Sequence, residues 1–171
     1  MARSSKQNEL DWLVTQHLSS ALRFATRLTG TVDAAEDVLQ EALVRVARSW
    51  KAFRKEAEFR TWLFRIVINV FRDRLARTNP ADSPLPSDHA DSRSPDPATE
   101  VQTVELGELI AGRISALPPR QREVMLLTAF EGLSTKEAAG LLGISEANVY
   151  STLAVARERL RRELAPYFVK R

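Results

Sequence analysis

A proline-rich stretch near the middle of the chain divides it into two parts. Five of the eight prolines lie between residues 79 and 99, at positions 80, 84, 86, 95 and 97, with serine and aspartate between them. A segment of this composition buries too little apolar surface to offset the entropy lost on ordering it. We therefore expect a flexible acidic linker at 79–100 between an N-terminal domain, 1–78, and a C-terminal domain, 101–171.

Apolar residues on both sides of this linker recur at helical spacing, and no segment alternates as a strand would. The pattern predicts helices over about 8–29, 33–50, 59–78, 100–116 and 120–131, with a loop at 51–58. Gly30 and Gly132 are expected to end two of these helices, and Pro118 and Pro119 to separate the last two. The expected fold is all-α, with two small helical domains.

The stretch from Ser134 to Arg162 predicts a helix-turn-helix. Ser134 and Glu137 have the spacing of a capping box, Gly143 suits a left-handed helix end, and Ser145 can cap the second helix. That helix has one buried stripe: Val149, Leu153, Ala156, Leu160 and Leu164. This motif is typical of DNA-binding proteins, in which the second helix lies in the major groove. An ordinary helical hairpin with a basic end is the competing interpretation.

The predicted N-terminal domain combines positive charge with aromatic rings. Between Arg45 and Arg77 there are ten cations, three anions and six interleaved aromatic residues. Proteins bind single-stranded nucleic acid with such a combination, in which cations contact the phosphate backbone and aromatic rings stack on the unpaired bases. Rings can also be core, which we expect for Phe59 and Trp62. Phe53 lies in the predicted loop and is the better candidate for a base contact.

Composition argues against several other classes of protein. The chain has no cysteine, and its two histidines, His17 and His89, are far apart, so we expect no metal, no cofactor and no histidine-based catalysis. The N-terminus resembles no signal peptide and no apolar run is long enough to span a membrane, which predicts a cytoplasmic protein. Net charges of +5 for 1–78, −4 for 79–100 and +2 for 101–171 suggest two domains that each face a polyanion.

The order of these parts carries a resemblance to a known family. The segments EDVLQEA and FRTWLFRIVINVFRDRL, a linker, LPPRQREVMLL and the helix-turn-helix follow one another along the chain. Together they resemble the extracytoplasmic-function (ECF) group of the sigma-70 family of bacterial RNA polymerase. The resemblance implies that the first domain binds the polymerase clamp and the promoter −10 element. It implies that the second domain binds the −35 element and the polymerase flap.

The same resemblance assigns roles to individual residues. The clamp-binding helix matches Asp37, Gln40, Glu41 and Arg45, a stripe that by itself would be interpreted as a solvated face with paired charges. The candidates for the −10 element are Phe53, Arg54, Lys55, Arg60, Arg65, Asn69 and Arg72. The candidates for the −35 element are Ser145, Glu146, Asn148, Tyr150, Ser151, Arg157 and Arg161. The chain departs from the family pattern at Lys55, where glycine is common, and at Thr152 and Val155, where arginine is common.

The function implied by the resemblance is that of a sigma factor, which guides core RNA polymerase to promoters and makes no covalent bond. Core polymerase and promoter DNA are the expected partners, and an anti-sigma factor is a further partner left open. Two alternatives also remain open. One is a helix-turn-helix regulator that is not a polymerase subunit, which would need a ligand or phosphoryl-acceptor pocket in its first domain. The other is a sigma mimic that only sequesters an anti-sigma factor, which would not need DNA-facing cations.

Overall fold

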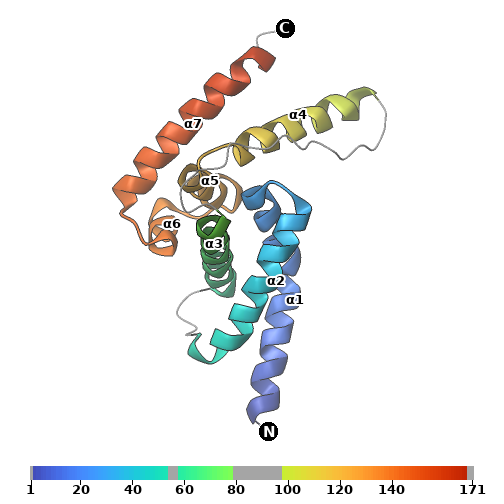
Figure 1. Cartoon of the computed structure of the whole chain (residues 1–171), viewed down its shortest axis with the longest axis vertical. Coiled ribbons are helices and arrows are strands. Elements are labelled where there is room, and N and C mark those ends of the chain that lie inside the picture. Colours follow the sequence, from blue (N-terminus) through green and yellow to red (C-terminus); the bar gives the residue numbers. More distant parts are fainter. Residues whose placement is uncertain (1, 54–57, 79–97, 169–171) are drawn as a thin grey trace.

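The computed structural model describes residues 2–53, 58–78 and 98–168, and every regular element in these ranges is helical (Figure 1). This confirms the predicted all-α fold. Most of the proposed linker, 79–97, and the candidate residues Arg54 and Lys55 lie outside the described residues. None of the described helices is both long enough and apolar enough to cross a membrane.

The N-terminal domain contains three long helices, α1 (Ala2–Thr29), α2 (Val32–Ser49) and α3 (Phe59–Thr78), and a 3₁₀ turn, η1 (Trp50–Ala52). Helix α1 begins six residues earlier than predicted. Gly30 has φ +91° between α1 and α2, a value that favours glycine. Thr31 then caps α2 by accepting a hydrogen bond from the backbone N–H of Ala34 at 3.3 Å.

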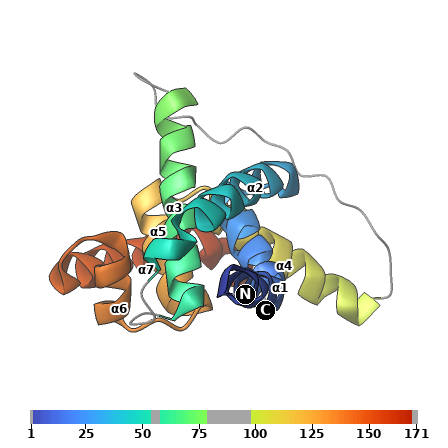
Figure 2. The ribbon, with the colours of Figure 1, turned by 90° about the horizontal axis from the view of Figure 1, so that it is seen from below.

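Helix α3 is the most deeply buried helix of this domain. Six of its apolar side chains are buried in addition to Phe59: Leu63, Phe64, Val67, Ile68, Val70 and Phe71. The rings of Phe24 in α1 and Phe64 are stacked with centroids 4.4 Å apart. Residues on several sides of α3 are inaccessible because α1, α2 and the C-terminal domain all pack against it (Figure 2).

The C-terminal domain contains α4 (Ala98–Ser115), α5 (Pro119–Met125), a π-helical turn, η2 (Leu126–Phe130), α6 (Thr135–Leu142) and α7 (Glu146–Phe168). Pro119 lies in the first turn of α5, where its missing N–H costs nothing. In η2 the N–H of Glu131 donates to the carbonyl of Leu126 at 3.0 Å, a spacing of five residues that the sequence did not predict. Gly132, at φ +71°, ends this segment as predicted.

The two predicted domains lie against one another, and their apolar residues form one continuous core. Helix α3 packs on α6, and α1 packs on α4 and η2 (Figures 1 and 2). The sequence predicted the helices of each domain and left their relative placement open. This placement decides which of the candidate binding residues are accessible.

Candidate nucleic-acid and protein interfaces

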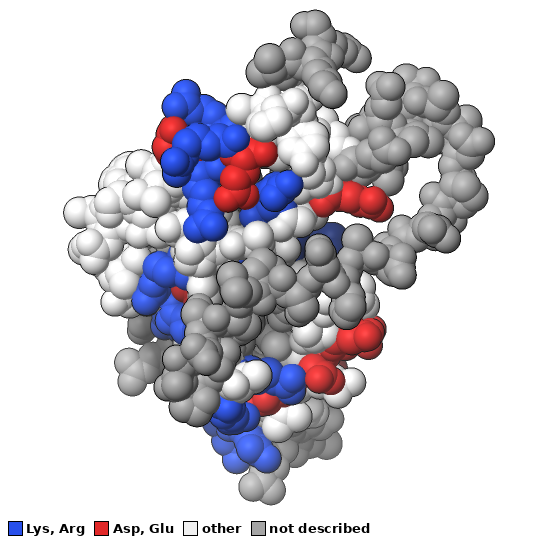
Figure 3. Space-filling view, turned by 45° about the horizontal axis from the view of Figure 1, so that its top comes forward, with Lys and Arg blue, Asp and Glu red and all other residues white. Residues whose placement is uncertain are grey.

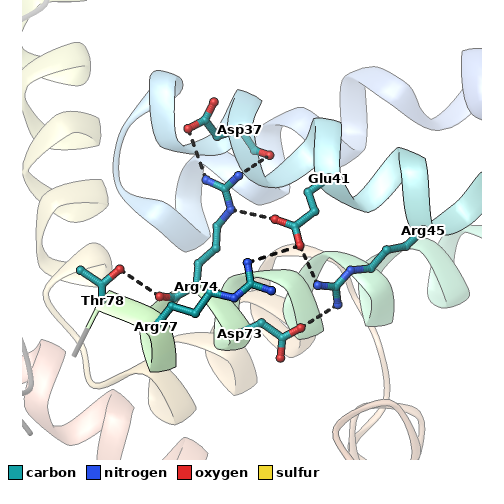
Figure 4. Close-up of polar contacts among 7 residues, drawn as sticks. All are labelled: Asp37, Glu41, Arg45, Asp73, Arg74, Arg77 and Thr78. Carbon is teal, nitrogen blue, oxygen red and sulfur yellow. Dashed lines mark hydrogen bonds and ion pairs between the residues drawn. The ribbon is translucent and has the colours of Figure 1, made fainter. Parts of the chain in front are cut away.

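The predicted clamp-binding stripe on α2 is part of a charge network that also includes α3 (Figure 4). Arg45 donates to Glu41 and to Asp73, both at 2.7 Å. Arg74 donates to Glu41 at 3.2 Å and to Asp37 at 3.3 Å. We call the six residues of this group the α2–α3 charge network: Asp37, Glu41, Arg45, Asp73, Arg74 and Arg77.

This network fixes its side chains while leaving them in contact with solvent. The hydrogen bond from Arg45 holds the pKa of the Glu41 carboxyl below its usual range, with a further contribution from Arg74. The hydrogen bonds to Asp73 and Glu41 raise the pKa of Arg45. Gln40, the fourth predicted residue of the stripe, is exposed beside the network. The surface is therefore an ordered, charged face that a protein partner can contact.

The sequence interpretation missed the contribution of α3 to this face. Asp73, Arg74 and Arg77 reach the α2 stripe only because the two helices pack side by side. The i, i+4 pair of Glu41 and Arg45 could be anticipated, since both lie on one face of a single helix. Pairing between helices has no comparable local signal.

Three predicted −10 residues lie on one face of α3, because Arg65, Asn69 and Arg72 are four and three residues apart. This face is turned toward the C-terminal domain. Arg65 donates to the carbonyl of Gly140 in α6 at 3.0 Å, and Arg72 bonds Glu123 in α5. Asn69, between them, is exposed.

The contact between Arg72 and Glu123 is a two-pronged ion pair in which the carboxylate is buried and the arginine is half-buried. Arg72 donates from Nε and Nη2 to the two carboxylate oxygens at 2.8 and 2.6 Å, and Glu123 is 1% exposed. This bonding raises the pKa of Arg72. Arg120 adds a longer contact to Glu123 at 3.4 Å. Two parallel charge-assisted hydrogen bonds fix orientation as well as distance.

A second carboxylate of the C-terminal domain, Glu131, binds another candidate −10 residue. Arg60 donates to the Glu131 carboxylate at 2.7 Å and to its backbone carbonyl at 2.8 Å. Arg27 of α1 approaches the same carboxylate at 3.8 Å, with its guanidinium 4.9 Å from the centre of the Phe130 ring. The structure therefore places Arg60, Arg65 and Arg72 all against the C-terminal domain.

Arg122 contributes a further contact between the domains. Its guanidinium donates to the backbone carbonyls of Leu28 in α1 and Leu117, and burial lowers the pKa of Arg122. Sequence reasoning missed Arg122, Glu123 and Glu131. The position of Glu123 directly before the apolar run Val124–Leu127 was a partial indication that its side chain is buried. A buried charge requires a partner, so a partner for Glu123 could have been sought.

Phe53, the predicted base contact, belongs to an aromatic cluster at the end of η1. Its ring stacks on Trp50 with centroids 5.3 Å apart and lies 4.6 Å from Trp62. Phe59 is buried in the same cluster, as predicted, whereas Trp62 and Phe53 are half-buried. Phe53 thus remains partly accessible beside two indoles.

The predicted helix-turn-helix is confirmed in α6 and α7. Ser134 and Glu137 form the capping box, with bonds of 3.2 and 2.8 Å, and Gly143 has φ +68°. The Ser145 hydroxyl accepts from the N–H of Asn148 at 3.2 Å. In the predicted stripe Val149, Leu153 and Ala156 are buried and Leu160 and Leu164 are half-buried. The seven candidate −35 residues are all exposed: Ser145, Glu146, Asn148, Tyr150, Ser151, Arg157 and Arg161.

Charge is unevenly distributed along α7. Residues 146–156 contain no lysine or arginine. Arg159 pairs with Glu163 at 2.9 Å, and Arg161 pairs with Glu158 at 2.8 Å. In Figure 3 the Lys and Arg side chains in the second half of α7 are interspersed with acidic ones. This helix therefore presents first a surface whose one charged residue is Glu146, and later a partly compensated basic surface.

The described residues offer no obvious site for a metal. No group of three or more histidine, cysteine or acidic side chains within them could hold an ion. What the geometry provides is charged and polar surface on helices, suited to macromolecular partners.

Comparison with known families assigns both halves of the chain. Residues 13–80 match Sigma-70 region 2, and residues 107–160 match Sigma-70, region 4. The chain is 31% identical over 159 residues to the ECF RNA polymerase sigma factor SigM of Mycobacterium tuberculosis, covering 90% of this chain and 76% of SigM. It is 34% identical over 160 residues to the ECF RNA polymerase sigma factor SigE of Mycolicibacterium smegmatis, covering 92% of this chain. The chain spans 62% of the length of that SigE.

Solved structures give the same fold. CnrH, in a complex with the cytosolic domain of CnrY, superposes with a TM-score of 0.66 at 31% identity, over 94% of this chain and 90% of CnrH. The sigma factor RpoE of Bartonella quintana, in a complex with the anti-sigma factor NepR, has a TM-score of 0.75 at 23% identity. That match covers 95% of this chain and 99% of RpoE.

Proposed function

This chain belongs to the ECF group of the sigma-70 family, and we therefore propose that it directs core RNA polymerase to specific promoters and helps to open their −10 region. The observation that carries this proposal is the pairing of a region 2 match, 13–80, with a region 4 match, 107–160, in one chain. A regulator with a helix-turn-helix alone would not need the first region. Sigma factors are non-catalytic, so we propose binding without covalent chemistry and without a cofactor, in the cytoplasm.

For the clamp of core polymerase, we propose the face formed by Gln40 and the α2–α3 charge network. Hydrogen bonds of 2.7 to 3.3 Å hold five of these side chains in place, and all remain in contact with solvent: Asp37, Glu41, Arg45, Asp73 and Arg74. Pre-ordered charges reduce the entropy lost when a protein partner binds. They also select against partners with the wrong charge pattern.

For the −35 element, we propose that α7 reads duplex DNA from the major groove. Asn148, Tyr150 and Ser151 lie in its first exposed turns, where a recognition helix contacts base edges. Arg157 and Arg161 lie two to three turns further on, where contact with phosphates is expected. The flap of core polymerase would hold this domain in place.

For the −10 element, we propose capture of unstacked bases by the aromatic cluster and of the strand's phosphates by α3. Separating a duplex costs about 1–2 kcal/mol per base-pair step in lost stacking. A base stacked on an aromatic ring regains about 1–3 kcal/mol. Phe53 is the proposed ring, and Asn69 is the proposed polar reader on α3.

A regulatory protein is a further partner in this proposal. CnrH, at 31% identity, was solved with the cytosolic domain of CnrY bound, which supports a protein regulator for this chain too. We propose an anti-sigma factor as that regulator.

Run-off transcription with purified core polymerase tests the proposal. The full chain is mixed with core polymerase and a library of randomised promoter DNA, and enriched templates are then transcribed singly. We expect transcripts that start at a fixed distance from a shared pair of sequence elements. A chain that yields no transcript with any template, while still binding an anti-sigma factor, would support the sigma mimic instead.

A charge-reversal variant tests the clamp surface. Glu41→Arg with Arg45→Glu preserves net charge and inverts the pattern presented to the polymerase. We expect binding to core polymerase to fall at least tenfold, because the variant would oppose like charges across the interface. The circular dichroism spectrum should be unchanged. Unaltered binding in a pull-down would show that the clamp contact lies elsewhere.

A further inference from the structure

We infer that Val155 of α7 is a specificity-determining residue, which selects a thymine in the −35 element by contact with the C5-methyl group of that base. The inference rests on the proposed function, in which α7 lies in the major groove of this element. It adds the chemistry of the bases that α7 selects, which are a thymine at Val155 and an adenine at Asn148.

Val155 lies on the side of α7 that points away from the protein. The buried stripe of this helix includes Val149, Leu153 and Ala156. On the opposite side, exposed residues recur at spacings that keep them on one face of a helix. We call these residues the outer face of α7: Ala147, Asn148, Ser151, Ala154 and Val155. A recognition helix presents such a face to the base edges in the major groove.

Packing within the chain does not account for a valine at this position. Val155 is 55% exposed, and a β-branched side chain forms helix less readily than alanine. A single exposed apolar residue is ordinary on a protein surface, so exposure by itself indicates nothing. The position of Val155 is what matters, because Ala154 beside it and Ser151 one turn earlier are small and let the helix approach the base edges closely.

Beyond its first turn, the outer face lacks the hydrogen-bond donors that guanine requires. Guanine presents only acceptors in the major groove, and it is selected above all by arginine or lysine. Residues 146–156 contain neither. The Ser151 hydroxyl donates to the backbone carbonyl of Asn148 at 3.2 Å, and the side chains of Ala154 and Val155 consist of methyl and methine groups. This part of the helix is therefore suited to an apolar contact.

Thymine is the base that an apolar side chain can select in the major groove, because it alone carries a C5-methyl group. Contact between this group and Val155 removes apolar surface of both from water, which stabilises the complex. Cytosine and adenine would instead place an amino group against the valine, and that group would lose its hydrogen bond to water. The preference for thymine thus needs no charged residue.

Asn148 complements Val155 from the first turn of the outer face. A side-chain amide can donate to N7 of adenine and accept from its N6 amino group. The two residues are seven positions apart, which corresponds to about 10 Å along the helix axis. They therefore contact different base pairs, so the two preferences can be altered separately.

The methyl group itself is the probe for this inference, because deoxyuridine pairs with adenine as thymine does and lacks only that group. A promoter obtained by the run-off selection described above is prepared with deoxyuridine in place of each −35 thymine in turn, on either strand. Binding of the full chain with core polymerase to each duplex is measured by fluorescence anisotropy. We expect one position at which deoxyuridine weakens binding about fourfold, the effect of one buried methyl group.

Two variants at position 155 connect that base pair to the valine. Val155→Ala should bind the thymine and deoxyuridine duplexes equally at this position, and it should fold because alanine is the better helix former. Val155→Arg supplies donors and should enrich guanine at the same pair in a repeated selection. Val32→Ala is the matched control, because Val32 is 54% exposed at the start of α2 and lies outside α7. It should keep the fourfold difference.

The outcomes separate this inference from the proposed function. A promoter whose −35 thymines can all be replaced by deoxyuridine without loss of binding would overturn the inference and leave the sigma activity standing. So would a Val155→Ala variant that keeps the fourfold difference, which would assign Val155 to a protein partner instead. A wild-type chain that supports no transcription from any template would refute the proposed function, and this inference with it.

Discussion

The two candidate DNA-binding surfaces differ in both charge and accessibility. The α3 surface is rich in arginine, but Arg60, Arg65 and Arg72 are bonded to the C-terminal domain. The start of α7 is exposed, but residues 146–156 carry no cation. Positive charge in a sequence therefore indicates a polyanion partner without showing that the surface is free to bind it. The exposed start of α7 has no internal contact to release before it binds, but it has no cation for the phosphates, which are left to Arg157 and the residues after it.

The largest expected effect separates the buried contact on α3 from its exposed neighbour. Arg72→Ala leaves the Glu123 carboxylate buried with only Arg120 at 3.4 Å, which should cost the packed form of the two domains about 2–4 kcal/mol of stability. The loss cannot exceed the free energy with which the two domains pack together, because Glu123 regains contact with water once the domains separate. Urea unfolding monitored by circular dichroism, together with solution scattering, measures both quantities.

Arg65→Ala is the control for this prediction. Arg65 is exposed and donates to the carbonyl of Gly140, an exposed residue, so water can replace the bond. We expect a loss below about 1 kcal/mol. Equal losses for the two variants would mean that the burial of Glu123 does not matter to the packing of the two domains.

The same two surfaces show which parts of the structure a sequence can predict. The caps and the turn of the helix-turn-helix were predicted to the residue, because Ser134, Gly143 and Ser145 act on neighbours within five positions. The second helix, α7, continues beyond the predicted stretch to Phe168. The pairing of Arg72 with Glu123 joins residues 51 positions apart and depends on how two separately predicted domains pack. No periodicity or capping rule contains that information.

In the candidate sites too, features set within one helix were predictable, whereas contacts between the domains were not. Exposure of the −35 residues followed from the buried stripe Val149, Leu153 and Ala156, since the rest of α7 must face outward. By contrast, the hydrogen bond from Arg60 to Glu131 could not be predicted from the pattern of apolar residues along α3. The π-helical turn η2, which leads into Glu131, was also missed, because residues 126–130 read as ordinary helix.

A smaller effect is expected at the aromatic cluster, where the −10 surface reads bases instead of phosphates. Phe53→Ala should spare binding to duplex promoter DNA and weaken strand opening by about 1–3 kcal/mol, the contribution of one stacked base. Permanganate reactivity of thymines measures opening, and a gel shift measures duplex binding. Phe53→Tyr keeps a ring and is the matched control. Normal opening by Phe53→Ala would mean that the ring serves only to pack on Trp50 and Trp62.

On the −35 side, a change of one residue should alter sequence preference with no effect on opening. Asn148→Ala removes a side-chain amide from the first turn of α7, where its loss should cost about 1–3 kcal/mol at one base pair. Binding to a set of single-base variants of the −35 element would identify that pair. Glu158→Ala, two to three turns further on, should leave the preference unchanged. A uniform loss across all variants would place Asn148 on the backbone instead of a base.

The smallest expected effect concerns the salt dependence of −35 binding. Arg157 is exposed, and among the described residues it has no ion-pair partner. Arg157→Ala should therefore lower the slope of log K against log salt by about one unit, the value for one phosphate contact. Arg161 donates to Glu158 at 3.1 and 2.8 Å, so its charge is already partly compensated and Arg161→Ala should lower the slope by less. Equal changes for the two variants would mean that DNA displaces Glu158 from Arg161. In that case α7, like α3, would hold an arginine on an internal carboxylate, and the two surfaces would differ in degree only.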